Sequence, residues 1–309
     1  MASKKLSIII PARNEIYLNQ TIENLLKQAE DEIEIIVVLD GYWPTELPKE
    51  DPRLILVHRE RQGMKASINS AVQMCSGEFI LKIDAHCTIS EGFDNILKQD
   101  CDKDDVIIAR RYSLNPDTFD IKRDRDFVDY EYLRWPYRDE NRSVHGSRVG
   151  IHAEQWKERT INNINILIDS TPTFQGSFYF MHKEHFIKRI EGLDEKGFGT
   201  FVGEAQQVGL KTWLGGGRCL INKKVWYSHL WKGQPYREAH LKEIGTPYSR
   251  IGQKELKESN TFCVDYFIHD KWKNRKHNLS WLIEKFDMPT WPKNWTELIK
   301  DEQWMKQQR

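Results

Sequence analysis

Short apolar runs alternate with amphipathic segments along the first third of the chain. Residues 22, 25 and 26 put three large apolar side chains on one face of a predicted helix over 21–29. A second helix is predicted over 64–74, and Gly77 after it is a typical helix stop. Buried strands are predicted at 6–10, 34–39, 54–57, 78–83 and 106–109. This alternation predicts an α/β fold with a doubly wound, mostly parallel, Rossmann-like sheet.

The pattern weakens between residues 113 and 169, where charged and aromatic residues dominate, including Arg134–Arg138. We predict a strand over 173–181, a helix over 203–210, a turn at 215–217 and a strand over 225–230. The remaining residues have helical spacing and many tryptophans: Trp272, Trp281, Trp291, Trp295 and Trp304. The predicted organisation is therefore an α/β domain over 1–236, with an insertion at 113–170, and a helical C-terminal extension over 237–309.

Polar side chains follow three of the predicted strands. Asn14 and Glu15 follow the first strand, Asp40 the second, and Asp84 and His86 the fourth. Ligands of doubly wound sheets bind beyond the carboxyl ends of the strands. The sequence therefore predicts a binding site at this edge of the sheet.

Charge is balanced, with 46 Lys and Arg against 46 Asp and Glu. A neutral chain lacks the broad positive surface that holds nucleic acid, although it can still act on a few nucleotides. The 11 Trp and 11 Tyr residues can pack a core or stack on sugars and bases.

The five cysteines are odd in number and form no C-x-x-C pair, which favours reduced thiols in a cytoplasmic protein. The first strand begins almost at once, without a signal peptide before it, and apolar runs stay short of about 18 residues. We predict a cytoplasmic protein without a transmembrane segment. Attachment to a membrane surface stays open.

Three early motifs resemble the family 2 glycosyltransferases. Residues 10–15 (IPARNE) resemble the P-x-x-N-E opening strand of that family, and residues 34–41 (EIIVVLDG) its second strand, except that Leu39 replaces the first acid. Residues 61–87 resemble its segment ending in D-A-D. Here that segment ends in D-A-H-C, which is more similar to the D-x-H motif of polypeptide N-acetylgalactosaminyltransferases.

Two later motifs extend the resemblance. Residues 197–204 are similar to the W-G-G-E-N region of those enzymes, and residues 228–236 to their later metal histidine and the basic, aromatic flap after it. The resemblance implies a GT-A fold and transfer of a sugar from a nucleotide donor, with a UDP-sugar favoured.

Asp84, His86 and His229 are the predicted metal ligands. A carboxylate and an imidazole at i and i+2 lie on the same side of an extended segment, and His229 adds a third ligand. Mixed oxygen and nitrogen ligation favours Mn²⁺, with Mg²⁺ as the alternative. Without a metal, Asp84 and His86 would form a surface turn, and His229 would be a core histidine.

The resemblance also implies a nucleotide-sugar pocket. Polar loop residues, helix-start charges and a strand glycine are the ordinary structural alternatives for its members. The predicted members are Pro11, Ala12, Asn14, Glu15, Asp40, Arg61, Lys65, Asp84, Gly176 and Tyr236.

Glu204 and Lys232 are the predicted catalytic residues. Lys232, three residues after His229, would neutralise the departing diphosphate as a flap closes. Glu204 at a helix start would be the base of an inverting reaction, or would position substrate in a retaining one. The D-x-H motif, His229 and the flap favour retention.

Several other functions remain open. The acceptor could be a protein, a glycan precursor or a hydroxymethylated base of viral DNA. A nucleotidyltransferase would usually carry a glycine-rich loop where residues 11–15 stand. A non-catalytic sugar-nucleotide-binding module would not need Asp84, His86, Glu204 and His229 together.

Overall fold

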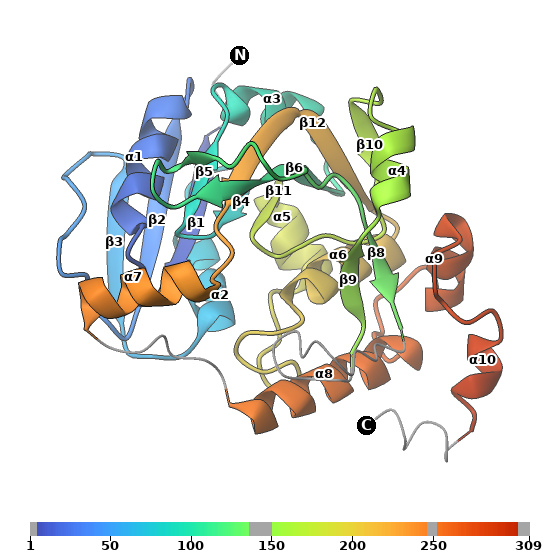
Figure 1. Cartoon of the computed structure of the whole chain (residues 1–309). Helices are drawn as coiled ribbons and strands as arrows, with labels where there is room; N and C mark the ends of the chain where they lie inside the picture. The colour runs from blue at the N-terminus through green and yellow to red at the C-terminus, as the bar shows by residue number, and fades with distance from the viewer. Residues whose placement is uncertain (1–4, 136–149, 246–251, 302–309) are drawn as a thin grey trace.

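A mixed sheet crosses the centre of the protein in the order β10–β12–β6–β11–β4–β1–β2–β3 (Figure 1). The computed structural model describes residues 5–135, 150–245 and 252–301. The path contains β1 (Leu6–Ala12), β2 (Ile33–Asp40), β3 (Leu54–Arg59), β4 (Phe79–Ile83), β6 (Asp105–Asn115), β10 (Ile168–Ser170), β11 (Phe178–His182) and β12 (Arg218–His229). Beside it, β5 (Cys87–Ile89) pairs with β12 and β7 (Asp120–Ile121) with β6, while β8 (Glu131–Arg134) and β9 (His152–Gln155) form a second sheet.

The pairing directions confirm the predicted doubly wound, mostly parallel α/β fold. β1 runs parallel to β2 and β4, β2 runs parallel to β3, and β12 runs parallel to β6. The exception at the centre is β11, which is antiparallel to β4 and β6. β1, β2 and β4 are almost wholly buried, which explains why their sequences are unbroken apolar runs.

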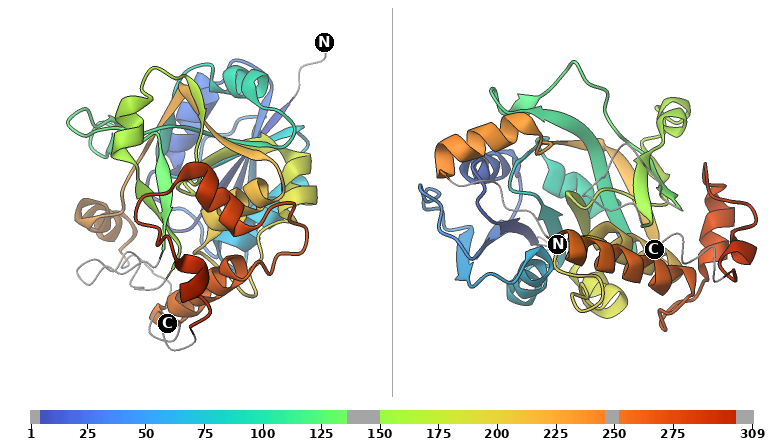
Figure 2. Two further views of the ribbon diagram at one scale, coloured as in Figure 1. Left: turned by 90° about the vertical axis from the view of Figure 1, so that its right-hand side faces the viewer. Right: turned by 60° about the horizontal axis from the view of Figure 1, so that its bottom comes forward.

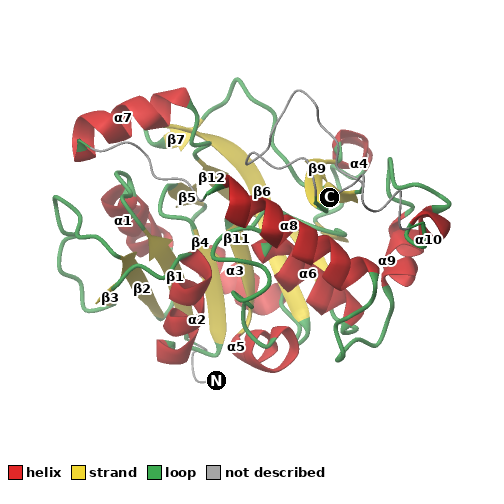
Figure 3. Ribbon diagram, turned by 90° about the horizontal axis from the view of Figure 1, so that it is seen from below, coloured by secondary structure: helices red, strands yellow, loops and turns green. Residues whose placement is uncertain are grey.

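Helices cover both faces of the sheet. α2 packs on β1 and β2, and α6 on β6 and β12, while α1 packs on β5 and α3 on β12. Figure 3 shows α2, α5 and α6 in front of the sheet and α3 behind it. The helices are α1 (Leu18–Gln28), α2 (Met64–Met74), α3 (Phe93–Asp100), α4 (Lys157–Asn162), α5 (Lys183–His185), the π-helical turn η2 (Phe186–Ile190), α6 (Glu204–Leu214), α7 (Gln234–Ile244), α8 (Gln253–Ile268), α9 (Leu279–Phe286) and α10 (Trp295–Leu298).

The strand predicted over 173–181 begins only at Phe178. Residues 174–177 leave the sheet because their polar groups bond elsewhere. The Gln175 side chain accepts from Arg111, and the Gly176 carbonyl accepts from Lys82. β12 is longer than predicted and starts at Arg218. Residues 174–177, which the apolar pattern assigned to the strand, therefore belong to the candidate site instead.

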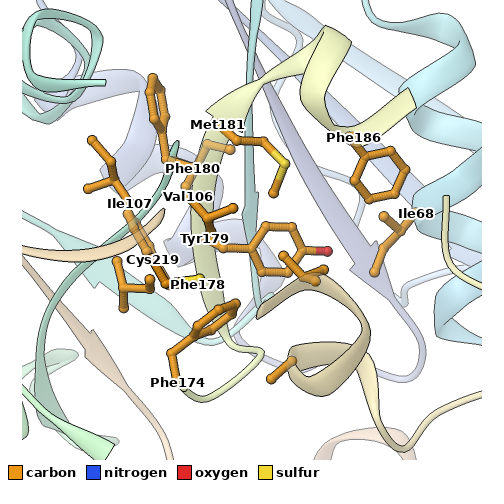
Figure 4. Packing of buried hydrophobic residues seen from close by; sticks show 14 of the residues in the cluster. Ile68, Val106, Ile107, Phe174, Phe178, Tyr179, Phe180, Met181, Phe186 and Cys219 are labelled. Carbon is orange, nitrogen blue, oxygen red and sulfur yellow. The ribbon is translucent and has the colours of Figure 1, made fainter. Parts of the chain in front are cut away.

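Aromatic side chains of β11 form the centre of the core (Figure 4). Phe180 stacks on Phe79 with ring centroids 5.3 Å apart, and Tyr179 packs beside Phe174. The Tyr179 hydroxyl is the polar end of this packing, and it donates a hydrogen bond to Glu204. β11 thus connects the core directly to the candidate site.

The C-terminal residues are helical, as predicted, and they pack on the same core as the sheet. Val264 and Phe267 of α8 are buried in it, and Phe198 contacts the Phe262 ring edge-on at 5.0 Å. Figure 2 shows α9 and α10 as the outer layer of this end of the molecule. Trp272, Trp291 and Trp295 are buried, whereas Trp304 and residues 136–138 lie outside the described residues. The domain division at residue 236 stays a prediction.

None of the helices within the described ranges is long and apolar enough to cross a membrane. The five cysteines are buried and free.

Candidate active site

Asp84, His86 and His229 converge at the edge of the sheet where β4 ends. His229 is the last residue of β12, and it pairs with Cys87 of β5, directly after His86. The Nε2 atoms of the two histidines lie 3.1 Å apart. The Oδ2 atom of Asp84 lies 3.3 Å from His229 Nε2 and 3.8 Å from His86 Nε2. One ligand atom from each residue falls within 4.8 Å of the other two, so the three residues form a group that fits one metal ion.

Glu15 orients His86. The Nδ1 atom of His86 lies 3.1 Å from Glu15 Oε2, and both side chains are buried. A proton on Nδ1 donated to this carboxylate leaves the Nε2 lone pair facing Asp84 and His229. Carboxylates hold metal-binding histidines in this way. His229 differs, because its buried Nδ1 atom has no hydrogen-bond partner among the described residues.

Burial lowers the pKa of His229 to about 4, more than Asp84 raises it. The imidazole is therefore neutral at neutral pH, which is the state that binds metals. Burial would raise the pKa of Asp84, but Lys82 and the two histidines together outweigh burial and hold that pKa well below its usual range. The group thus offers one carboxylate and neutral imidazole nitrogen, a mixed oxygen and nitrogen donor set for a divalent metal ion.

Lys82 holds the other oxygen of Asp84. This lysine lies on β4 and is almost fully buried, with its Nζ atom 2.7 Å from Asp84 Oδ1. It also donates to the Gly176 carbonyl at 2.6 Å. Burial would lower the pKa of Lys82, but Asp84 and Glu204 raise it, so the lysine stays charged. Asp84 therefore presents only Oδ2 to the two histidines.

Glu204 is the second acid on Lys82. Its Oε1 atom lies 3.3 Å from Lys82 Nζ and accepts from the Tyr179 hydroxyl at 2.9 Å. The carboxylate is buried beneath Gly176, where a Cβ atom added to the glycine would lie only 2.7 Å from Glu204 Oε2. Burial raises the pKa of Glu204 despite Lys82. Glu204 is thus packed into the wall of the site, with both oxygens facing Lys82.

The segment after β12 closes onto Glu15. Lys232 donates to Glu15 Oε1 at 2.6 Å, and the Tyr236 hydroxyl donates to Oε2 at 2.9 Å. Tyr236 is fully buried. Burial would raise the pKa of Glu15, but Lys232 and His86 hold it at about 2. We call residues 230–236 the flap, because they join β12 to α7 and cover the Glu15 side of the site.

The charges of these groups leave the site negative. Asp84, Glu204 and Glu15 supply three carboxylates, and Lys82 and Lys232 supply two ammonium groups. With the three acids ionised, one net negative charge remains beside the two imidazoles, which is the electrostatic setting that favours a divalent cation.

Three predicted nucleotide contacts lie apart from this network, around the turn before α2. Both Asp40 oxygens accept backbone N–H groups, from Gln62 at 2.7 Å and Gly63 at 2.9 Å. Arg61 is exposed beside Gly41. Lys65 is buried and donates to the Phe198 carbonyl at 2.8 Å. Asp40 and Lys65 therefore have structural partners here.

Pro11 and Ala12 are the last residues of β1, paired with Val38 and Leu39. Asn14 follows with a φ of 49°, a left-handed conformation that asparagine tolerates better than most residues. This turn brings Glu15 back beneath the flap.

Lys82 and Tyr179 are the residues of this network that sequence reasoning missed. The sequence carried a signal for Lys82, since a lysine in the otherwise apolar run of residues 79–83 must find a buried counter-charge. Asp84, two positions later on the same side of the strand, is the nearest candidate. Tyr179 gave no such signal, because a tyrosine is common in a buried strand.

Residues 7–189 match the family Glycosyl transferase family 2, which is more than half of the chain. The chain belongs to glycosyl transferase family 2. The family confirms the predicted enzyme class, a glycosyltransferase, and residues 7–189 include Glu15, Lys82, Asp84 and His86.

Curated relatives carry the same class of name. Glycosyltransferase GlyG of Streptococcus pneumoniae serotype 4 is 30% identical over 123 residues, 37% of this chain and 41% of that protein. A Drosophila melanogaster protein named "Putative polypeptide N-acetylgalactosaminyltransferase 13" is 26% identical over 236 residues, 70% of this chain and 39% of that protein. The chain thus spans about two fifths or less of the curated relatives it matches.

The crystal structure of GalNAc-T7 with UDP, GalNAc and Mn²⁺ has a TM-score of 0.57 to this chain at 14% identity. The superposition covers 93% of this chain and 57% of that one. At this identity the likeness concerns the fold, and it confirms the predicted GT-A architecture.

Proposed function

We propose that this protein transfers a sugar from a nucleotide-sugar donor, a UDP-sugar, to a hydroxyl group, with Mn²⁺ as the metal. The observation that carries the proposal is the group Asp84, His86 and His229, with Glu15 orienting His86 at 3.1 Å. Mg²⁺ is the alternative metal. The N-acetylgalactosaminyltransferase relative and the UDP and Mn²⁺ in the GalNAc-T7 structure support this choice.

Asp84 Oδ2 and the two His Nε2 atoms would hold the cation. When bound, a divalent cation neutralises the charge that develops on a departing diphosphate. The donor set fits, because the His229 imidazole is neutral, the Nε2 atom of His86 lies beside that of His229, and the second Asp84 oxygen is already satisfied by Lys82. The residual negative charge of the site supports the same assignment.

The carboxyl end of β1 and the turn before α2 would form the nucleotide side of the pocket. Pro11, Ala12 and Asn14 supply the strand end, and Arg61 is the exposed cation nearby. Asp40 and Lys65 would act mainly by holding this turn, since their polar atoms bond backbone groups. Glu15 would contribute through His86 and the flap.

Lys232 would assist departure of the diphosphate. Its ammonium group bonds a carboxylate, Glu15, and a phosphate oxygen is the same kind of partner. Lys232 would leave Glu15 and bind a phosphate oxygen when the donor is present, which would couple the flap to donor binding. Tyr236 would keep the flap anchored on Glu15 meanwhile.

We propose that the reaction retains the anomeric configuration, which the resemblance of the D-x-H motif, His229 and the flap to retaining enzymes supports. The bond from the sugar anomeric carbon to the diphosphate oxygen breaks, and the acceptor oxygen bonds to the same carbon on the same face. The acceptor proton then passes to the departing phosphate oxygen. Glu204, buried beneath Gly176, would help to position substrate without accepting its proton, since Lys82 and Tyr179 already engage its carboxylate.

A nucleotide-release screen tests the proposal. UDP-, GDP- and TDP-sugars would be incubated with the protein and Mn²⁺, and free nucleoside diphosphate would be measured. We expect release from a UDP-sugar and little from the others. The proposal fails if no UDP-sugar is hydrolysed or transferred under any of these conditions.

A further inference from the structure

A cavity of about 440 Å³ lies beside the metal-binding group. Trp231 of the flap is one wall, and its ring centroid lies 5.7 Å from that of His229. The other walls come from β6, from the loop between β7 and β8, and from the junction of β9 with α4. The lining residues are Arg111, Tyr112, Ser113, Asp124, Arg125, Asp126, Val128, Gln155, Lys157 and Trp231.

The walls of this cavity are held in place by bonds within the chain. Arg111 and Val128 exchange backbone hydrogen bonds of 3.0 and 2.8 Å, and the Lys122 N–H donates to the Ser113 carbonyl at 2.7 Å. The buried Arg111 guanidinium donates to Glu131 and Gln175, and it lies 5.5 Å from the Trp231 ring centroid. The β6 backbone beside the cavity is therefore already paired, which removes the strand edge that an extended peptide would use.

The charges that line the cavity cancel. Glu131 neutralises Arg111, and the two cations Arg125 and Lys157 equal the two acids Asp124 and Asp126 in number, with Asp124 also 3.9 Å from Lys122. A lining with balanced charges lacks the positive surface that a polyphosphate backbone needs. The remaining lining combines hydroxyl and amide groups with the indole of Trp231, which is 48% exposed. Hydroxyl groups of a sugar find donors and acceptors here, and the C–H face of its ring can pack on the electron-rich indole.

We propose that this cavity binds the acceptor and that the acceptor is a neutral saccharide. The proposal rests on the proposed sugar transfer and adds the class of acceptor to it. Trp231 would be the platform for the acceptor ring, two residues from the metal ligand His229. Asp124, Asp126 and Gln155 would bind its hydroxyl groups.

The test separates donor chemistry from acceptor binding. Purified full-length protein with Mn²⁺ and the UDP-sugar that it hydrolyses would be given three kinds of acceptor. These are an array of neutral mono- and disaccharides, a serine- and threonine-containing peptide, and an oligonucleotide with hydroxymethylated bases. We expect transfer to a neutral saccharide. The proposal is overturned if sugar is transferred only to the peptide or the oligonucleotide, or to no saccharide. Hydrolysis of the donor without any acceptor is measured separately, and its absence would count against the proposed function itself.

Trp231→Ala then tests the cavity itself. We expect KM for the saccharide to rise about tenfold, well beyond any change in KM for the donor, and Trp231→Phe to restore most of the affinity. Trp281→Ala, at a partly exposed tryptophan in the C-terminal helices, is the matched control and should leave acceptor KM unchanged. An unchanged acceptor KM in Trp231→Ala overturns the cavity assignment.

Discussion

Two buried charged residues flank the metal-binding group from opposite sides. Lys82 contacts Asp84 on one side, and Glu15 contacts His86 on the other. Lys82 lies within the sheet and joins β4 to the β11 turn and to α6. Glu15 joins the end of β1 to the flap. The aspartate side is thus held by the core, whereas the histidine side is held by contacts with the flap.

This difference separates stability from catalysis. Removal of Lys82 should damage the fold and the metal site together, because two acids lose a buried counter-charge. Removal of Glu15 or Lys232 should affect metal binding and turnover more than folding, because the flap is peripheral to the sheet.

The largest effect is expected for Lys82→Met. It leaves Asp84 and Glu204 without their shared cation, so we expect a loss of about 3–5 kcal/mol in unfolding free energy. We also expect weaker Mn²⁺ binding, because Asp84 loses the bond that turns Oδ2 towards the histidines. Urea denaturation and calorimetric Mn²⁺ titration measure the two. The double variant Lys82→Met/Glu204→Gln should recover part of the stability, since one of the two acids is then neutral.

Lys211→Met is the control for that change. Lys211 is also buried, but its ammonium group donates to the Ile190 carbonyl. We expect Mn²⁺ affinity to remain normal in this variant. Equal loss of Mn²⁺ binding in both variants would mean that Lys82 has no specific role at Asp84.

Lys232→Ala should lower kcat by about 100-fold, the cost typical of one lost charge-stabilising donor. Affinity for UDP should change little, because the charge matters most as the diphosphate departs. Steady-state kinetics and UDP titration measure the two quantities. Lys224→Ala, which removes a lysine paired with Asp100, is the control. If UDP binding collapses while kcat stays normal, Lys232 is a ground-state anchor.

Glu15→Gln should weaken Mn²⁺ binding about 10- to 100-fold, as is typical when the carboxylate behind a metal-binding histidine is removed. Glu34→Gln is a close control, because Glu34 is another buried acid with a pKa of about 2, bonded to Ser7 and Ser76. Calorimetric titration of the apoproteins gives both affinities. The same Mn²⁺ affinity for both variants would exclude Glu15 as the residue that orients His86.

The smallest effect expected is a difference in pH dependence between the two acids. Glu15 has its pKa lowered from 4.5 to about 2 on folding, so its stabilising effect is present above pH 4.5 and is lost as pH falls towards 2. The pKa of Glu204 is raised above 4.5, so its contribution is greatest in acid and declines as pH rises past 4.5.

Unfolding free energies of the apoprotein between pH 3 and pH 7 test this contrast. The difference between wild type and Glu15→Gln should grow with pH, and that between wild type and Glu204→Gln should shrink. If both differences in unfolding free energy grow or both shrink with pH, folding does not shift the pKa values of the two acids in opposite directions.

The sheet and the candidate metal-binding group were predictable from sequence because each leaves a local pattern. Apolar runs gave the strands, and the D-x-H motif after one of them gave Asp84 and His86. The Glu15 network was harder, since Lys232 and Tyr236 lie more than 200 positions from Glu15, and pattern alone does not show which acid a flap lysine will meet. Asp40 lies at the end of a strand, where ligand contacts are expected, yet its oxygens accept backbone N–H groups of residues 62 and 63.

The most direct test of the account is metal-dependent turnover. Wild-type protein would be stripped with chelator, supplied with a UDP-sugar, and titrated with Mn²⁺ while UDP release is followed, in parallel with Asp84→Asn. We predict no release before Mn²⁺ is added, a saturable return of activity in the wild type, and none in Asp84→Asn although its fold is intact by circular dichroism. Full turnover in the presence of chelator would contradict the account.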